Sequence, residues 1–267
     1  MTLAARLRAA APSWLRHAWY MTDAGYRRQT LALRRLRRLR QRAMPAIWKQ
    51  TAGVVTTGPF RGMRYLRSWR GHPFPQKLLG TYEKELEPAI HAICARGYDT
   101  AIVIGAGEGY YACGLALRLP TVRVTAFEAV DELHAAIRDI AAANGLTGRI
   151  DVRGRCTPAD LRDALADGGL VVCDVEGFEG ELLDPDRLPA LRRTDVLVEV
   201  HDAIEPGVSQ ALSDRFQATH VVEPIAQQPR TLADLPAGIV LEPTLALAAM
   251  SEGRGAATTN WLWMRRR

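Results

Sequence analysis

From about Tyr98 onward the sequence alternates short apolar runs with longer helical stretches, and this alternation leaves few folds open to the chain. The apolar runs are expected to form strands near residues 100–107, 122–129, 149–154, 169–177 and 195–202. Apolar strands that alternate with helices build a parallel sheet covered on both faces. We therefore expect an α/β fold with a doubly wound, Rossmann-like sheet.

The C-terminal part follows a different pattern, because strands at 219–226 and 258–265 flank a helix near 243–251. A last strand that returns antiparallel to the others fits this order. Upstream of the core, residues 54–66 are expected to form a β-hairpin, and residues 82–95 a helix.

Two core helices carry start signals in the sequence. Asp131 is expected to cap a helix that stops at Gly145. Thr157 and Asp160, with Pro158 between them, have the spacing of a capping box.

A basic segment precedes the core. Residues 1–50 contain twelve Lys or Arg against one acid, Asp23, whereas the rest of the chain is mildly acidic. Residues 26–44 are expected to be a helix that breaks at Pro45, with a thin apolar stripe and an otherwise arginine-covered surface. The stripe is Ala32, Leu36, Leu39 and Ala43.

This arginine-rich helix has several compatible interpretations. It can be a solvated helix on its own domain, or it can bind an anionic membrane surface or a protein partner. Nucleic acid is the least favoured partner, because no aromatic residue interleaves with the arginines. The patterns together divide the chain into a basic helical extension (1–50), a hairpin and helix leading into the core (51–97), and a core domain (98–267).

Composition excludes several classes of protein. With 48% hydrophobic and 24% charged residues, the chain is neither disordered nor a small disulfide scaffold. It has no run of about 18 apolar residues to span a bilayer. We expect a cytoplasmic protein, with surface membrane association left open, and reduced cysteines in place of disulfides.

In parallel sheets of this kind, ligands bind beyond the carboxyl ends of the strands. Several polar or glycine-rich positions follow directly after predicted strands and should share one rim of the sheet. They are the loop Gly105–Gly109, Glu128, Asp174, Glu176, Glu199 and His201.

The glycine loop indicates the kind of ligand. Gly105, Gly107 and Gly109 are spaced GxGxG, but Tyr110 stands where a dinucleotide fingerprint needs a glycine, and no phosphate-loop motif is present. Glu128 ends the next strand, where an acid accepts hydrogen bonds from a ribose diol. An adenosine that carries an amino acid, S-adenosylmethionine, fits this pattern best.

Several motifs then resemble those of FkbM-type methyltransferases, which are class I S-adenosylmethionine-dependent enzymes. The motifs are VIGAGEGYYACGLA, TAFEAVDEL, AANG, VCDVEGFEGELLDP and LVEVHD, with GPFRGMRYL and GTYEKEL upstream. The resemblance covers roughly residues 54–265. It implies a seven-stranded sheet with a reversed last strand and, in many members, methylation of hydroxyls on sugars, glycans or related metabolites.

Cofactor-binding residues follow from the loop and the resemblance together. The predicted set is Gly105, Ala106, Gly107, Glu108, Gly109, Tyr110, Glu128 and Ala129, with Glu83 added by analogy as a contact to the methionine amino group. Two positions depart from the usual class I pattern. Val103 stands where an acid usually precedes the first glycine, and Arg155-Cys156-Thr157 replaces a carboxylate after the third strand.

The reacting groups are expected at the ends of the fourth and fifth strands. Asp174 and Glu176 are two residues apart, as are Glu199 and His201, so each pair shares one strand face. Asp174, Glu176 and His201 are the predicted catalytic residues, acting as a base on an alcohol acceptor. The alternative is Mg²⁺ or Mn²⁺ held by these three residues and Glu199.

The sequence thus predicts an S-adenosylmethionine-dependent methyltransferase, with O-methylation of a small hydroxylated molecule or glycan as its reaction. The competing hypothesis is a non-catalytic protein with a degenerate methyltransferase fold, in which the arginine-rich helix recruits a partner or membrane. Nothing in the sequence predicts the oligomeric state.

Overall fold

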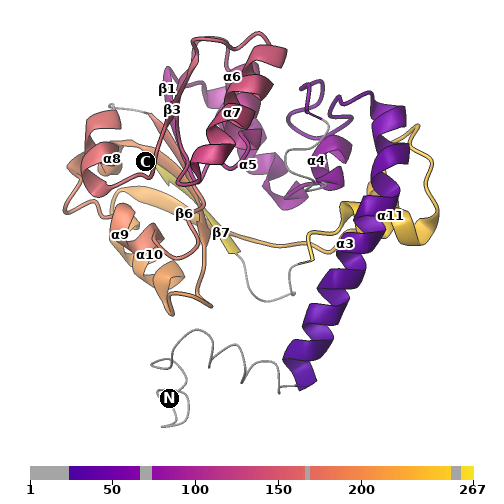
Figure 1. The fold of residues 1–267 in the computed structure, drawn as a ribbon. Helices are drawn as coiled ribbons and strands as arrows, with labels where there is room; N and C mark the ends of the chain where they lie inside the picture. Colours follow the sequence, from indigo (N-terminus) through magenta and orange to yellow (C-terminus); the bar gives the residue numbers. More distant parts are fainter. Residues whose placement is uncertain (1–23, 67–73, 166–168, 254–259) are drawn as a thin grey trace.

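The structure is a computed structural model that describes residues 24–66, 74–165, 169–253 and 260–267. Its centre is a seven-stranded sheet with the order β3-β2-β1-β4-β5-β7-β6 (Figure 1). The strands are β1 (Thr100–Ile104), β2 (Arg123–Phe127), β3 (Ile150–Arg153), β4 (Leu170–Cys173), β5 (Asp195–Val200), β6 (His220–Ala226) and β7 (Asn260–Arg266). Strands β1 to β5 are parallel, and β7 lies antiparallel between β5 and β6. The predicted α/β fold with a reversed last strand is confirmed.

Helices cover both faces of the sheet (Figure 1). One face carries α5 (Glu87–Arg96), α6 (Tyr110–Arg118) and α7 (Asp131–Ala143), and the other carries α8 (Pro158–Ala164), α9 (Glu179–Leu182) and α10 (Val208–Phe216). Short elements complete the chain: α4 (Pro75–Leu79), the 3₁₀ turns η1 (Lys84–Leu86), η2 (Pro189–Arg193) and η3 (Leu232–Asp234), and α11 (Pro243–Met250).

The strands alternate strictly between two cores. In β1, Ala101 and Val103 join the core under α6, whereas Ile102 joins the core under α10. Trp261 and Trp263 of β7 are both buried and pack in the core on the α6 side. This alternation, with a period of two, is what buries a strand on both faces.

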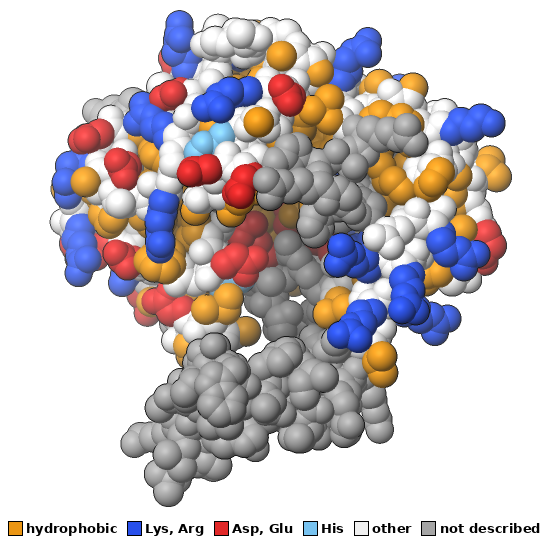
Figure 2. All heavy atoms as spheres, viewed as in Figure 1, with side chains coloured by type: hydrophobic (Ala, Val, Ile, Leu, Met, Phe, Trp, Pro, Cys, Tyr) orange, Lys and Arg blue, Asp and Glu red, His pale blue; other side chains and the backbone are white. Residues whose placement is uncertain are grey.

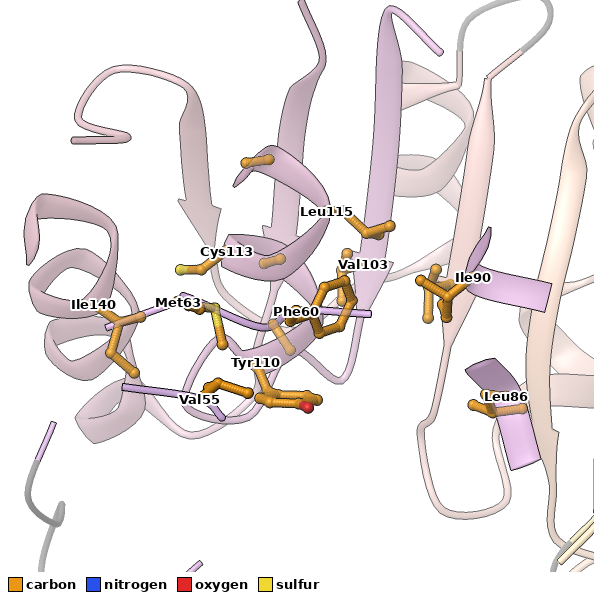
Figure 3. Packing of buried hydrophobic residues seen from close by; sticks show 14 of the residues in the cluster. Val55, Phe60, Met63, Leu86, Ile90, Val103, Tyr110, Cys113, Leu115 and Ile140 are labelled. Atoms are coloured by element: carbon orange, nitrogen blue, oxygen red, sulfur yellow. The ribbon is translucent and has the colours of Figure 1, made fainter. Parts of the chain in front are cut away.

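The segment before the core packs onto α6. Phe60 is fully buried, and its ring meets that of Tyr110 edge to face at 5.2 Å between centroids (Figure 3). A Cβ on Gly114 of α6 would lie 2.5 Å from the Phe60 ring, so the glycine is what lets this ring sit against the helix. The upstream segment is therefore part of the same core as the glycine loop.

The first described helix, α3 (Ala24–Thr51), corrects the predicted break at Pro45, because the helix continues through the proline. A proline inside a helix removes one backbone hydrogen bond. Packing outweighs this loss, since Ala43 and Ile47 are fully buried and this part of α3 contacts α4 and α11.

Residues 54–66 fold back on themselves, but the predicted hairpin has no regular strands. A single bridge joins Val54 and Arg64, and tight turns occupy the region between Gly58 and Met63. Those turns coil the chain so that Phe60 can reach the core. The helix predicted over 82–95 begins only at Glu87, after η1.

The helix caps were predicted in part. Thr157 and Asp160 form the expected capping box at α8. Asp131 is not a cap, because α7 begins at Asp131 itself and Val130 is the capping position. The carboxylate of Glu128 accepts the Val130 N–H instead (2.8 Å), which leaves Asp131 to favour the positive end of the helix dipole.

The four cysteines are all free, as expected for reduced thiols. Among the residues that the structure describes, none of the helices combines the length and apolar character that crossing a bilayer requires. The division of the chain at residues 50 and 97 stays a prediction.

Candidate active site

A cavity of about 350 Å³ lies beyond the carboxyl ends of β1, β2 and β4, where the fold places ligands. Its walls combine apolar side chains, two glycines and four charged residues. They are Ile104, Gly105, Gly107, Phe127, Glu128, Ala129, Arg155, Cys156, Asp174, Val175, Glu176, Phe178 and Leu182. The structure thus brings together Gly105, Gly107, Glu128, Ala129, Asp174 and Glu176 from the predicted set.

Gly105 and Gly107, in the wall of the cavity, lack a side chain with different structural consequences. Gly105 has a φ of 78°, and a Cβ there would lie 1.7 Å from the carbonyl oxygen of Asp174, so the ends of β1 and β4 meet only because no side chain is present. Gly107 has a φ of 56° and nothing within 4 Å of a built Cβ. Its bare backbone therefore faces open space, where a ligand can approach closely.

Glu128 is tied to the glycine loop. Its Oε2 accepts the Gly107 N–H at 2.7 Å, and its Oε1 accepts the Val130 N–H at 2.8 Å. Each carboxylate oxygen has a second lone pair, so both can still accept a hydroxyl from a diol. Glu128 therefore fixes the loop and keeps the acceptor capacity that ribose binding requires.

Two residues at the mouth of the cavity were not predicted as site residues. The guanidinium of Arg155 lies 4.6 Å from the ring centroid of Phe178, and Phe178 is 44% exposed. Both side chains line the cavity. A flat cation stacked on an aromatic ring is a surface on which a planar base can lie.

A second group of polar residues surrounds His201, which follows β5. Its Nε2 lies 3.4 Å from Glu176 Oε2, and 3.8 Å from both Asp174 Oδ1 and Glu199 Oε2. The predicted catalytic residues Asp174, Glu176 and His201 are therefore brought together at one edge of the cavity. Glu176 has a φ of 54°, a strained conformation for a residue with a side chain, which is typical of functional sites.

The strongest contact of His201 involves a residue that sequence reasoning missed. Nδ1 of His201 lies 2.5 Å from Oε1 of Glu179, which is fully buried at the start of α9. The signal was present in the EGFEGELL motif, where Glu179 follows Glu176 by three residues. Nothing in that spacing identified His201 as its partner.

This contact shifts the pKa values of both groups. Burial opposes protonation of His201, but the hydrogen bond to Glu179 and the charges of Glu179, Asp174 and Glu176 outweigh it and raise the pKa of the imidazole. Burial likewise opposes ionisation of Glu179, yet hydrogen bonds from His201 and from backbone N–H groups keep the pKa of this carboxyl below its usual value. The pair is an ionised carboxylate that holds one side of an imidazole.

The same cluster has the donors of a cation site. Ligand atoms of Asp174, Glu176 and His201 all lie within 4.8 Å of one another. Two carboxylates and an imidazole are donors that Mn²⁺ accepts, and the carboxylates alone suit Mg²⁺. Glu199 is not part of this group, although its buried carboxylate lies 3.8 Å from His201 Nε2.

Three predicted cofactor residues lie away from this cavity. The carboxylate of Glu108 is buried and paired with the Lys77 ammonium, and it accepts the hydroxyl hydrogen bond of Tyr65. Tyr110 is buried in the aromatic cluster with Phe60. Glu108 is therefore held by Lys77 and Tyr65 of the upstream segment, and a contact from it to the cofactor stays a prediction.

Glu83 is the third predicted cofactor residue that is buried away from this cavity. It has a φ of 45°, it is 2% exposed, and its carboxylate accepts a hydrogen bond from the hydroxyl of Tyr111. A strained, buried acid is a costly arrangement for a chain to keep. The structure does not bring Glu83 to the walls of the cavity, so a contact to the cofactor stays a prediction.

The remaining predicted positions serve the shape of the loop. Gly109 has a φ of 99°, and a Cβ there would lie 3.3 Å from the backbone of Ile137, so this glycine lets α6 approach α7. Ala106, within the loop, is buried. Val103 is 2% exposed in the core and is not among the residues that line the cavity.

Comparison with known proteins gives one similar curated sequence. No protein-family model matches the chain, so membership of the FkbM-type family stays a prediction. The release factor glutamine methyltransferase of Bordetella pertussis (strain Tohama I) is 33% identical over 131 residues. The match covers 46% of this chain and 46% of that protein, so the chain spans about half the length of its curated relative.

Solved structures with a similar arrangement include several methyltransferases. An O-methyltransferase from Bacillus cereus in complex with SAH has a TM-score of 0.45 at 14% identity, over 66% of this chain and 78% of that one. The ribosomal protein L11 methylase of Lactobacillus delbrueckii subsp. bulgaricus has a TM-score of 0.45 at 17% identity, over 69% and 78%. Precorrin-6y C5,15-methyltransferase of Geobacter metallireducens has 0.44 at 15%, over 67% and 88%.

Proposed function

We propose that the protein is an S-adenosylmethionine-dependent methyltransferase that methylates a hydroxyl group of a sugar, glycan or other small metabolite. One observation carries the proposal: the glycine backbone, Glu128 and the His201 cluster converge on a single cavity beyond the sheet. The methyltransferase activity named for the curated relative supports methyl transfer as the reaction class, over the half of the chain that the match covers.

The residues present fit the cofactor. Ile104, Phe127 and Leu182 give apolar walls for an adenine ring, and Glu128 has free acceptor capacity for a ribose diol. The open space beside Gly107 admits the ligand next to the backbone. When bound, S-adenosylmethionine supplies an electrophilic methyl group on a sulfonium.

His201 is the proposed general base. An ionised carboxylate only accepts hydrogen bonds, so Nδ1 carries the proton that Glu179 accepts, and Nε2 carries the lone pair. Nε2 lies 3.8 Å from Asp174 Oδ1 and 3.4 Å from Glu176 Oε2, and an acceptor hydroxyl bound at this edge donates its one hydrogen bond to the lone pair of Nε2. The hydroxyl then loses its proton to Nε2 as its oxygen is alkylated.

The raised pKa of His201 is compatible with this role. A base works best when its pKa lies near the operating pH, because enough of it is neutral and it still takes a proton readily. The neighbouring carboxylates also stabilise the imidazolium that forms. Catalysis otherwise depends on holding the hydroxyl in line with the methyl group.

A screen for methyl transfer tests the proposal. The purified protein is incubated with S-adenosylmethionine and a panel of sugars, glycans and hydroxylated metabolites, and S-adenosylhomocysteine is quantified by mass spectrometry. A glutamine-containing peptide is included, because the named acceptor of the curated relative is a glutamine. Turnover on a hydroxylated acceptor that His201→Gln reduces by about 100-fold or more supports the proposal.

Two results contradict it. Turnover confined to the glutamine peptide excludes hydroxyl specificity. Binding of the cofactor without S-adenosylhomocysteine formation on any acceptor of the panel favours the non-catalytic alternative. His91→Gln, at an exposed position on α5, is the matched control and leaves turnover unchanged.

A further inference from the structure

The outward face of α3 carries a row of arginines. Arg34, Arg38 and Arg42 are spaced i, i+4 and i+8, and Arg35 lies beside them, so all four share one side of the helix. We call these four residues the basic stripe. The opposite side faces the protein, since Ala43 is buried there. The stripe extends about 12 Å along the helix axis.

The basic stripe is exposed, and few acidic side chains interact with it. All four arginines are exposed, and Figure 2 shows Lys and Arg side chains gathered over the helix that Figure 1 labels α3. Within the part of the chain that the structure describes, Arg34, Arg35 and Arg38 form no ion pair. Arg42 lies near one acid, Glu242, whose pKa it helps to lower after that side chain's own hydrogen bonds at the start of α11.

Arg40 lies on the same helix but, unlike the basic stripe, contacts the rest of the protein. Its guanidinium is turned toward the protein, where it donates hydrogen bonds to the carbonyl oxygens of Ala248 (3.4 Å) and Ser251. One arginine of α3 thus holds the C-terminal part of α11, whereas Arg34, Arg35 and Arg38 of the basic stripe form no ion pair with the described part of the fold. A row of unpaired cations on a helix attracts an anionic partner.

The residues that neighbour the stripe in the structure or precede it in the sequence indicate the chemistry of that partner. Leu31 continues the same face, at i−3 from Arg34, and is 62% exposed. The sequence before the helix adds large apolar and aromatic residues to further arginines, at Trp14, Leu15 and Trp19. Arginine combined with tryptophan and leucine is the composition of segments that lie in a membrane interface.

We propose that the basic stripe docks the protein on the surface of an anionic lipid bilayer. A straight row of guanidinium groups matches a flat layer of lipid phosphates, and the charge attraction is additive along the row. The described stripe has no aromatic residue among its arginines to stack on bases, which disfavours single-stranded nucleic acid. It also lacks the central apolar cluster on which tight protein interfaces depend. This proposal is independent of the proposed enzymatic function.

Vesicle flotation with the full chain tests the proposal. One set of vesicles contains phosphatidylcholine alone, and the other contains phosphatidylcholine mixed with phosphatidylglycerol. We expect the protein to float with the anionic vesicles at low salt and to dissociate from them at high salt. It should not bind the neutral vesicles. The quadruple variant R34Q/R35Q/R38Q/R42Q should lose at least about tenfold in vesicle binding.

A matched variant controls for net charge. R61Q/R123Q/R138Q/R162Q removes the same number of charges from exposed arginines of the core and should bind the anionic vesicles as the wild type does. Equal loss in both variants, or full binding by the stripe variant, overturns the proposal. So does RNA that displaces the protein from the vesicles and binds it more tightly than they do, since that result assigns the stripe to nucleic acid.

Discussion

Oε1 of Glu179 lies 2.5 Å from Nδ1 of His201, so a buried carboxylate fixes one face of the histidine at the edge of the cavity. The two residues are far apart in sequence, and they meet because α9 and the end of β5 lie side by side. The contact decides which nitrogen of His201 carries the proton. The proposed role of His201 as a general base therefore depends on this contact.

The pKa of His201 should depend on Glu179. Wild-type His201 is expected to titrate above its ordinary value of 6.5, because carboxylates outweigh the effect of burial. Glu179→Gln keeps the shape of the side chain and removes its charge and its capacity to accept a hydrogen bond at both terminal atoms, so the pKa of His201 should fall. NMR titration of the imidazole signals, assigned with His201→Gln, measures this directly.

His220 provides the internal reference for that titration. Burial lowers the pKa of His220, whose Nε2 lies 2.8 Å from the Thr194 carbonyl oxygen, and Glu179 does not contact it. Its signal should be the same in wild type and variant. A His201 pKa that is unchanged by Glu179→Gln would show that the carboxylate does not control the imidazole.

Removal of divalent cations separates the two uses of the cluster. If His201 is a general base, dialysis against EDTA should leave methyl transfer within about twofold of its untreated rate. If Asp174, Glu176 and His201 hold a cation, EDTA should abolish transfer and Mn²⁺ or Mg²⁺ should restore it. The assay is S-adenosylhomocysteine formation, with zinc-free buffers and a cation-independent methyltransferase treated in parallel. Restoration by Mn²⁺ would contradict the base mechanism.

Gly105→Ala should remove the cofactor site through a backbone clash. The new Cβ would lie 1.7 Å from the Asp174 carbonyl oxygen, so the end of β4 must move and cofactor binding should be lost. Gly145→Ala is the matched control, because it has a similar φ of 69° and open space around its Cβ. The control should cost about 1 kcal/mol in the free energy of unfolding and bind the cofactor normally.

Thermal unfolding and cofactor titration of both variants make the comparison. Equal cofactor affinity in Gly105→Ala and wild type would contradict the assignment of this loop to the cofactor. A loss of binding in both variants would instead point to the strained backbone alone as the cause.

The buried pair of Lys77 and Glu108 should control stability at acidic pH. Burial opposes ionisation of Glu108, but the charge and hydrogen bond of Lys77 prevail and lower the pKa of the carboxyl below its ordinary value of 4.5. A depressed pKa gives stability that is fully present above the unfolded value and is lost as pH falls through the folded one. The wild type should therefore lose stability as pH drops below about 4.5.

Lys77→Met tests this pair. It leaves Glu108 buried without its cation, which should cost about 3 kcal/mol in the free energy of unfolding at neutral pH. The deficit should shrink as Glu108 becomes protonated. Urea unfolding across the pH range measures both effects, with Lys49→Met, at an exposed position of α3, as the control. A deficit that is constant with pH would contradict the charge pairing.

The sheet and the rim of the site could be predicted because they rest on local patterns. The strict alternation in β1 and the glycine loop after it place the cavity, and Asp174, Glu176 and His201 reach one edge of it as the strand ends require. The capping box at Thr157 is equally local, since its partners are three residues apart.

The parts that could not be predicted depend on distant partners. Nothing near Pro45 indicates that α4 and α11 hold the helix together beyond it. Glu108 was predicted to bind the cofactor from its place in the loop, and its ion pair with Lys77 could not be read from the sequence. Glu179 needed the position of His201 to be recognised. In each case the deciding contact joins residues that only the folded chain brings together.

Calorimetric titration with S-adenosylmethionine and S-adenosylhomocysteine tests the central claim most directly. The account predicts micromolar binding of both ligands, which Glu128→Ala weakens by about 100-fold because the ribose contacts and the loop anchor are lost. Asp139→Ala, at an exposed acid on α7, should bind as the wild type does. Absence of binding to either ligand up to millimolar concentration would contradict the cofactor site and, with it, the proposed methyltransferase.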